Sequence, residues 1–335
     1  MRVAILSPIA WRTPPRHYGP WEQMAYNIAE GMVKAGIEVS LFATGDSITS
    51  GKLNYVVDTG YEEDKTQDAK VVECLHISNL MERSAEFDII HNHFDFLPLT
   101  YCGLIKTPVI TTIHGFSSSK IIPVYQKYNH LSSYVSISNS DRSPILKYIA
   151  TVYNGIATND FSFSPVSDDY LLFLGRIHPD KGTLEAIRIA TKGKKRLIIS
   201  GIVQDESYFR EKIQPQLNDD IIFVGHSGPQ ARNKLLGKAL ALLHPINFNE
   251  PFGLSVVEAM YCGTPVIAFN RGSMPELIRD NKNGFLVENV DEASDAVDRI
   301  HLLDRSDCHQ WAKANFSSEK MVADYLALYK QIVHR

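Results

Sequence analysis

Short apolar runs alternate with longer amphipathic stretches along the 335 residues of the chain. In the first half, the apolar runs predict buried strands at residues 3–7, 38–43, 88–91, 109–112, 134–137 and 151–152. Between the first two runs, residues 21–35 have the spacing of an amphipathic helix, which Gly36 ends. Strands that alternate with helices in this way are typical of doubly wound α/β domains with a parallel sheet.

A second series of the same units follows a break in the pattern. Its predicted strands are residues 170–175, 196–201, 221–225, 241–244 and 265–269. The break consists of a turn at Asn154-Gly155-Ile156 and a linker-like stretch at residues 161–169. We therefore predict two similar α/β domains, at residues 1–158 and 159–314. A last helix, at about residues 318–333, carries Met321, Tyr325, Leu328 and Ile332 at helical spacing.

The overall composition is ordinary for a globular protein, with 44% hydrophobic residues, 21% charged residues and a formal net charge of −4. No nucleic-acid partner is expected, because a basic excess is lacking. One local basic run, residues 192–196, is interpreted as a solvated turn, with contact to an anionic membrane surface as the alternative.

The four cysteines are scattered without metal or disulfide spacing, which suits a reducing compartment. The N-terminal apolar run is too short for a signal peptide, and no stretch approaches the roughly 18 apolar residues of a membrane span. We expect a cytoplasmic protein, and peripheral attachment at the inner face of the membrane stays open.

The most informative segment of the chain is residues 249–268. Glu250 and Glu258 lie eight residues apart, across a Pro-Phe-Gly turn that opens an apolar helix. The first amide groups of a helix lack intrahelical partners and form an anion site. Glu258 lies three and four residues beyond Ser255 and Leu254, on the helix face that carries these amides. A ligand with a diphosphate at the helix start would meet a carboxylate at each end, and a nucleotide-sugar has this layout.

This segment resembles the Glu-x7-Glu signature of the retaining glycosyltransferases of family 4. The likeness extends to the Pro-Phe-Gly, Glu-Ala-Met and Gly-Thr-Pro-Val-Ile-Ala strings around the two acids. The resemblance implies the GT-B fold, in which two Rossmann-like doubly wound domains face each other across a cleft. It further implies that residues 1–158 bind the acceptor, that residues 159–314 bind the donor, and that the helix in residues 315–335 packs back on the first domain.

The same resemblance assigns roles in the second domain. Arg176 and Lys181, in a Gly-Arg…Lys-Gly turn, are implied to bind the donor diphosphate, where fixed cations stabilise the charge that develops on the leaving phosphate. Glu250 is implied to face the sugar hydroxyls, and Glu258 the ribose diol, since a carboxylate accepts two hydroxyl hydrogen bonds. Backbone N–H groups near the helix start are expected at the sugar and phosphates, and strand-following loops at the nucleobase. The candidates for contact with the sugar and phosphates are Phe252, Gly253, Leu254 and Ser255. The candidates for contact with the nucleobase are Ile202 and the Gly225-His226-Ser227 turn.

In the first domain, Thr111-Thr112-Ile113-His114-Gly115-Phe116 resembles the family's Thr-x-His-Gly element, which implies that His114 contacts the donor sugar at the reacting centre. Gly19 corresponds to the family's glycine-rich loop near the diphosphate and the acceptor. Pro20 stands where many relatives have a second glycine, and it cannot donate an amide hydrogen bond. Side chains would then contribute there in place of the backbone, or would be solvated loop charges: Arg12, Arg16 and His17.

His91-Asn92-His93-Phe94-Asp95 has a spacing that can bind metal, because alternate residues of a strand share a face. The family has similar residues near the acceptor side, however, and we expect no metal ligands in this chain.

Together these features predict a metal-independent glycosyltransferase without a cofactor, which moves a hexose from a nucleoside diphosphate to an acceptor hydroxyl. The resemblance implies retention of the anomeric configuration, and the lack of an obvious nucleophile fits a front-face mechanism. UDP-glucose is the favoured donor and GDP-mannose the alternative. Aromatic residues of the first domain suit a sugar or lipid-linked sugar acceptor, as in polysaccharide or glycoconjugate synthesis: Trp11, Tyr18, Phe94, Phe116 and Tyr125.

Three other functions fit a similar two-domain architecture. A nucleotide-sugar epimerase would act on the donor without an acceptor, and a glycan phosphorylase would need a pyridoxal phosphate lysine, for which the chain has no local context. A non-catalytic sugar-nucleotide-binding subunit should have lost at least one of the four expected site residues. All four are present: His114, Arg176, Lys181 and Glu250.

Overall fold

The computed structural model describes residues 1–17, 19–116 and 118–334, so Tyr18 lies outside the described part. The chain divides into two compact units. The first comprises residues 1–155 together with 318–335, and the second comprises residues 156–317. The chain passes from the first unit to the second after residue 155, three residues before the predicted boundary at 158. It returns to the first unit after residue 317, three residues beyond the predicted boundary at 314.

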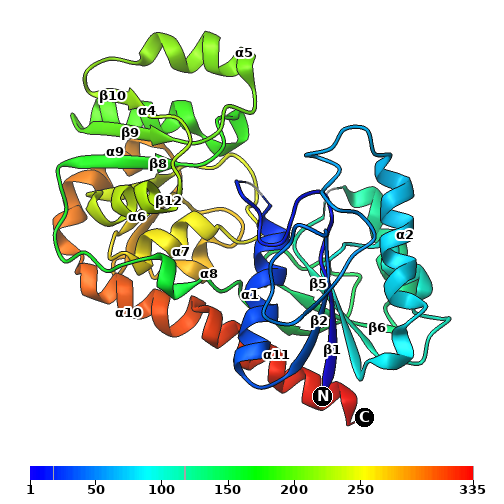
Figure 1. Ribbon diagram of the computed structural model, residues 1–335. Helices are drawn as coiled ribbons and strands as arrows, with labels where there is room; N and C mark the ends of the chain where they lie inside the picture. Colours follow the sequence, from blue (N-terminus) through cyan, green and yellow to red (C-terminus); the bar gives the residue numbers. More distant parts are fainter. Residues whose placement is uncertain (18, 117, 335) are drawn as a thin grey trace. The chain divides into compact units, whose positions relative to one another are not determined.

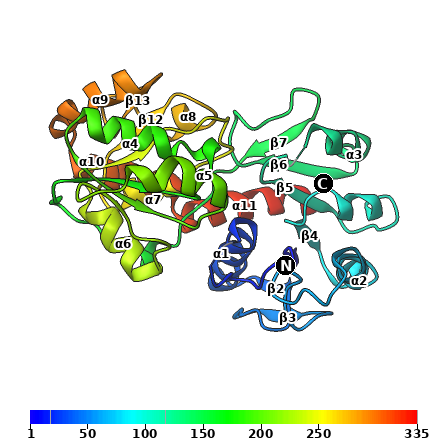
Figure 2. The ribbon, with the colours of Figure 1, turned by 90° about the horizontal axis from the view of Figure 1, so that it is seen from above.

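The first unit contains a parallel sheet whose described strands run in the order β3-β2-β1-β4-β5-β6-β7. Helices α1 and α11 cover one face of this sheet, and α2 and α3 cover the other (Figure 1 and Figure 2). The order reverses between β1 and β4, and ligands of doubly wound sheets bind beyond the carboxyl ends of strands at such a point. The bounds are β1 (Arg2–Leu6), β2 (Glu38–Phe42), β3 (Lys52–Asn54), β4 (Ile89–Asn92), β5 (Val109–Ile113), β6 (Ser132–Ser136), β7 (Tyr148–Thr151), α1 (Pro20–Lys34), α2 (Ala69–Met81), α3 (Ile122–Tyr128) and α11 (Ser318–Val333).

The central strands of this unit are apolar on both faces because helices cover both. In β1, Ala4 and Leu6 pack in one hydrophobic cluster with Leu80 of α2 and Tyr125 of α3. The alternate residues Val3 and Ile5 are also fully buried. Continuous apolar strands of this kind are characteristic of parallel sheets.

The C-terminal helix α11 is an integral part of the first unit. It packs against α1, where the missing side chain of Gly31 makes room for it, since a Cβ atom there would lie 2.3 Å from Cγ2 of Val322. On the same helix, Tyr325 and Tyr329 are almost completely buried. Residues at the end of the chain therefore complete the core that begins with β1.

The second unit repeats the plan, with described strands in the order β10-β9-β8-β11-β12-β13. One face is covered by α4 and α9, whose Ile187 and Val297 share a hydrophobic cluster with Phe173 of β8. On the other side, α7 packs against β11 and β12, and α10 packs against α7. The bounds are β8 (Tyr170–Leu174), β9 (Arg196–Ser200), β10 (Ile221–Phe223), β11 (Ala241–His244), β12 (Val266–Phe269), β13 (Gly284–Val287), α4 (Thr183–Lys192), α5 (Glu206–Tyr208), α6 (Pro229–Lys238), α7 (Leu254–Tyr261), α8 (Met274–Leu277), α9 (Val290–Arg299) and α10 (Arg305–Phe316).

Each predicted strand has a counterpart within a few residues, and the two doubly wound sheets confirm the predicted α/β class. Two edge strands, β3 and β13, were not predicted. The first is only three residues long and mostly polar, and the second starts with Gly284 directly after a polar turn. Within the described residues, no helix combines the length and apolar character needed to cross a membrane.

Candidate functional site

Arg176, Lys181 and Glu250 follow β8 and β11, the two strands between which the strand order of the second unit reverses. Lys181 ends a short 3-10 turn that follows β8, and Gly182 then starts α4 with φ 73°. A Cβ atom on Gly182 would lie 1.8 Å from the carbonyl oxygen of Pro245, which follows β11. A glycine is thus needed to let the two loops approach, and this approach brings Lys181 to the loop that carries Glu250.

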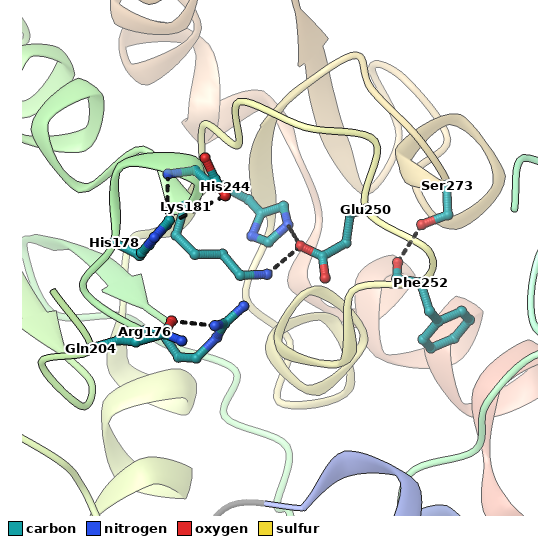
Figure 3. Close-up of polar contacts among 9 residues, drawn as sticks. Arg176, His178, Lys181, Gln204, His244, Glu250, Phe252 and Ser273 are labelled. Carbon is teal, nitrogen blue, oxygen red and sulfur yellow. Dashed lines mark hydrogen bonds and ion pairs between the residues drawn. The ribbon is translucent and has the colours of Figure 1, made fainter. Parts of the chain in front are cut away.

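Lys181 and Glu250 form a direct ion pair, shown in Figure 3. The ammonium Nζ of Lys181 donates to Oε2 of Glu250 at 2.5 Å, and the two side chains are only 15% and 14% exposed. The ammonium also lies 4.7 Å from the ring centroid of Phe248, a cation–π contact. Partial burial strengthens this pair relative to a surface salt bridge, because solvent screens it less.

His244 is a third member of this cluster, which the sequence analysis missed. Its Nε2 lies 3.8 Å from Oε2 of Glu250, and among the described residues this buried nitrogen has no hydrogen-bond partner. The pKa of His244 is lowered to about 4, chiefly by burial; the negative charge of Glu250 opposes this shift, and the positive charge of Lys181 adds to it. The imidazole is therefore neutral near pH 7, and the positive charge next to Glu250 belongs to Lys181. Only its place at the end of a predicted strand beside Pro245 hinted at this position.

The loop that carries Glu250 is fixed by the turn after β12. The Oγ of Ser273 donates to the carbonyl oxygen of Phe252 at 2.5 Å, and the Ser273 N–H donates to that of Glu250 at 3.0 Å. A Cβ atom on the preceding Gly272, at φ 57°, would lie 2.4 Å from the Glu250 nitrogen. These contacts fix the backbone of the loop from which the Glu250 side chain extends.

Arg176 extends from the end of β8 toward the same cluster, and its guanidinium donates to Oε1 of Gln204 (Figure 3). The turn is tight, because a Cβ atom on Gly201 would lie 1.7 Å from the carbonyl oxygen of Gly175. Two cationic side chains, Arg176 and Lys181, thus lie in the same connection between β8 and α4, at the carboxyl end of β8.

Helix α7 begins directly after Gly253, as the sequence predicted. Gly253 has φ 99°, and no side chain among the described residues caps the helix start. Leu254 and Ser255 lie in the first turn of the helix, where backbone N–H groups have no intrahelical acceptor. One turn further, the buried carboxylate of Glu258 forms an ion pair with Arg232 of α6. Burial raises the pKa of Glu258, and Arg232 acts in the opposite direction. Arg232 could not be predicted as a site residue, since a single arginine in a polar helix carries no signal of its own.

The turn after β10, expected near a nucleobase, is open on one side. Gly225 has φ 72°, and among the described residues no atom beyond its own chain neighbours lies within 4 Å of a Cβ atom built on it. Its carbonyl oxygen accepts a hydrogen bond of 3.0 Å from Ser200 Oγ, which also lies 2.8 Å from Ser227 Oγ. Ile202, two residues after the end of β9, is 39% exposed.

In the first unit, His114 follows β5 and lies in a buried histidine cluster. Its Nε2 is 2.9 Å from Nδ1 of His93, and its ring stacks on Trp21 with centroids 5.7 Å apart. Burial lowers the pKa of His114 to about 3, so the imidazole is neutral.

The loop before α1 contains Gly19 at φ 154°, followed by Pro20 in the first turn of the helix. A Cβ atom on Gly19 would lie 2.9 Å from Oε2 of Glu22. Burial raises the pKa of Glu22 to about 7, although the backbone of Glu22 and Trp11 donates hydrogen bonds to it. Arg16, considered as a substitute ligand, pairs instead with Asp46 at 3.3 Å and with Glu63 at 3.9 Å.

The His91-x-His93-x-Asp95 string does not converge on one point. His91 bonds through Nδ1 to the Tyr329 hydroxyl at 2.6 Å and through Nε2 to Thr112 Oγ1 at 2.7 Å. Asp95 accepts a hydrogen bond from the Tyr125 hydroxyl. In the described part of the chain, no three His, Cys, Asp or Glu side chains are arranged to hold a metal ion.

Two family models account for most of the chain. Residues 22–160 match the model described as Glycosyltransferase Family 4, and residues 158–317 match Glycosyl transferases group 1. The chain belongs to the family 4 glycosyltransferases. It is therefore a transferase enzyme, and the GT-B fold expected from the resemblance is confirmed.

Individual proteins with similar sequences are also named glycosyltransferases. The chain is 24% identical over 350 residues to an uncharacterized glycosyltransferase, MJ1607, of Methanocaldococcus jannaschii, covering 90% of this chain and 89% of that one. It is 31% identical over 191 residues to the D-inositol 3-phosphate glycosyltransferase of Mycolicibacterium smegmatis. That match covers 51% of this chain and only 42% of the mycobacterial enzyme, so the chain spans less than half of that relative's length.

Solved structures share the whole fold. Sucrose-phosphate synthase from Thermosynechococcus elongatus superposes with a TM-score of 0.80 at 18% identity, and 99% of each chain is covered. HepE of Anabaena, solved in complex with UDP and glucose, gives a TM-score of 0.73 at 18% identity and covers 99% of this chain and 100% of its own.

Proposed function

We propose that this family 4 glycosyltransferase moves a hexose from a UDP-sugar, with UDP-glucose favoured, to a hydroxyl of a sugar or lipid-linked sugar, with retention and without a metal ion. The observation that carries the proposal is the partly buried Lys181–Glu250 pair at the strand-order reversal of the second unit, with the start of α7 after Gly253, where the cap residue has no side chain. The complex of the related HepE fold with UDP and glucose supports a uridine donor.

In the proposed reaction, the bond between the sugar C1 and the β-phosphate oxygen breaks as the acceptor oxygen bonds to C1 on the same face. The acceptor's proton passes to the departing phosphate oxygen, so no separate base is required. Arg176 and Lys181 stabilise the negative charge on the diphosphate as it develops, together with backbone N–H groups at the start of α7. These fixed charges would take the part that a divalent cation plays in other transferases.

Glu250 and Glu258 would hold the two ends of the donor. Glu250, fixed by Ser273 and paired with Lys181, would accept hydrogen bonds from the sugar hydroxyls. Glu258, kept in place by Arg232, would accept those of the ribose diol. Because Lys181 touches Glu250, the same lysine would connect the sugar subsite with the diphosphate subsite.

A panel of nucleotide-sugars tests this proposal, with simple sugars and a lipid-linked sugar fraction as acceptors and excess chelator present. Wild type should release UDP and form a glycoside, whereas Glu250→Gln should be at least about 100-fold slower. Glu211→Gln, at an exposed carboxylate of the same unit, is the control and should match wild type.

Other outcomes of the panel would overturn the proposal. A donor that is isomerised without any acceptor would indicate an epimerase. Loss of turnover in chelator that Mg²⁺ restores would contradict metal independence. Turnover of GDP-mannose in preference to every UDP-sugar would replace the donor, and a product of inverted configuration would exclude retention.

A further inference from the structure

Three buried histidines of the first unit, His91, His93 and His114, lie in contact with one another, and the proposed reaction assigns no role to His91 or His93. His91 lies in β4, His93 directly follows it, and His114 follows the neighbouring strand β5. The rings of His91 and His93 lie 4.0 Å apart between centroids, and those of His93 and His114 lie 5.2 Å apart. His93 has no exposed surface, whereas His114 keeps 8% of its surface exposed. His93 therefore lies behind His114, as seen from solvent.

The contact between His93 and His114 is a hydrogen bond between two imidazoles. Nδ1 of His93 and Nε2 of His114 are 2.9 Å apart, so one of the two nitrogens carries the proton. His91 does not share in this bond, because both of its nitrogens are bonded to hydroxyl groups of Tyr329 and Thr112. On its other side, His114 meets the ring plane of Trp21. The ring of His114 is thus fixed from two directions.

The imidazole rings of His93 and His114 are both neutral, so the position of the proton between them defines the tautomer of each ring. Burial lowers the pKa of His93 well below its usual range, and the neighbouring His91 and His114 add to the effect. The pKa of His114 is lowered to about 3 by burial alone. A neutral imidazole has one N–H donor and one bare acceptor nitrogen.

The surroundings of His93 Nε2 decide between the two tautomers. This nitrogen is buried and has no hydrogen-bond partner among the described residues. If His114 donated to His93, the proton of His93 would sit on Nε2 as an unpaired buried N–H group, which folded proteins rarely contain. If His93 donates through Nδ1, its Nε2 is only a bare acceptor. His114 then accepts through Nε2 and carries its own proton on Nδ1.

We propose that His93 is a positioning residue that holds His114 as the Nδ1–H tautomer, which makes His114 a hydrogen-bond donor to a hydroxyl of the donor sugar. The assignment of that hydroxyl rests on the proposed function, whereas the tautomer does not. Without His93 the imidazole could present either a proton or a lone pair at the same position. A fixed donor would select a hydroxyl or other oxygen acceptor there and would need no rearrangement during the reaction.

Nitrogen-15 spectra of protein labelled at histidine test the tautomer directly, without any substrate. Long-range couplings between ring protons and nitrogens distinguish Nδ1–H from Nε2–H, and the signals of His114 are those that His114→Gln removes from the twelve histidines. Wild type should show Nδ1–H at His114. His93→Asn, whose amide nitrogen can occupy the place of Nδ1, should keep this tautomer, whereas His93→Leu should give a mixture or Nε2–H. Tyr329→Phe, which removes a partner of His91 only, should leave it unchanged.

Kinetics with the donor identified from the panel give the second readout. His93→Leu should lower kcat about 10-fold, as the loss of one hydrogen bond predicts, while His93→Asn and Tyr329→Phe stay within about threefold of wild type. Melting temperatures show whether each variant is folded, and His93→Met, which also lacks an N–H donor, replaces His93→Leu if the latter is not. Nε2–H at His114 in wild type, or Nδ1–H that persists in every His93 variant, would overturn the proposal even if no donor is found. A clear tautomer effect without any turnover would count against the proposed function alone.

Discussion

Two side chains expected at different parts of the donor, Lys181 at the phosphates and Glu250 at the sugar, form one ion pair. The pair is held by backbone contacts from both sides, because Gly182 lets its turn approach Pro245 and Ser273 fixes the loop of Glu250. His244, the nearest other titratable group to Glu250 within this cluster, is neutral. The cationic character of this part of the site therefore rests on Lys181 and Arg176.

Lys181→Ala should reduce kcat by about 10²–10³-fold, the usual cost of removing one group that stabilises developing negative charge. The melting temperature should change little, because the fold is carried by the loop contacts. The matched control is Lys195→Ala, which removes an exposed pair with Asp169 in the same unit and should leave turnover unchanged. Equal turnover of the two variants would contradict the role assigned to Lys181.

Glu22 predicts a pH dependence of stability. Its pKa is raised to about 7 in the folded chain from an ordinary value of 4.5, so the folded state binds more protons than the unfolded state between these values. This contribution is fully present below pH 4.5 and is lost as the pH rises through 7. Between pH 5 and 8, wild type should lose roughly 2 kcal/mol relative to Glu22→Gln. Urea unfolding of both proteins at the two pH values measures the difference, and parallel losses would show that Glu22 is not responsible.

At the scale of elements, the strands could be predicted because each is a short apolar run between polar turns. The edge strands β3 and β13 escaped, since a few residues paired on one side need little hydrophobic pattern. Within the site, Lys181, Glu250 and the start of α7 could be found from local motifs. Arg232 and His244 could not, because their importance comes from contacts with residues 26 and 6 positions away, as in Arg232–Glu258 and His244–Glu250. His93 could not be found either, because its hydrogen-bond partner His114 lies 21 positions away in the sequence.

The packing of α1 against α11 provides a test at this scale. Gly31→Ala places a methyl group 2.3 Å from Val322 Cγ2, so it should destabilise the first unit by about 1–3 kcal/mol through overpacking. Gly237→Ala in α6 is the control, because the nearest atom to its Cβ is 3.4 Å away, Cβ of Ser164. That variant should be neutral or up to about 1 kcal/mol more stable, since alanine favours a helix interior. Thermal unfolding of the two variants compares the predictions, and an unperturbed Gly31→Ala would show that α11 can move away at no cost.

At the scale of the whole molecule, the second unit is one continuous segment, residues 156–317, and the first unit is formed by the two segments that precede and follow it in the sequence. The first unit needs α11 for its core, because Tyr325 and Tyr329 are buried there and bond to Thr112 and His91. Removal of each such side chain costs about 3–5 kcal/mol, a large part of the roughly 5–15 kcal/mol that stabilises a folded domain. A protein ending at residue 317 should therefore have an unfolded first unit and a folded second unit. Circular dichroism and limited proteolysis should show the second unit as the resistant fragment, whereas a protein ending at residue 333 should behave as full length. A protein ending at residue 317 that kept both units folded would mean that α11 is dispensable for the core of the first unit.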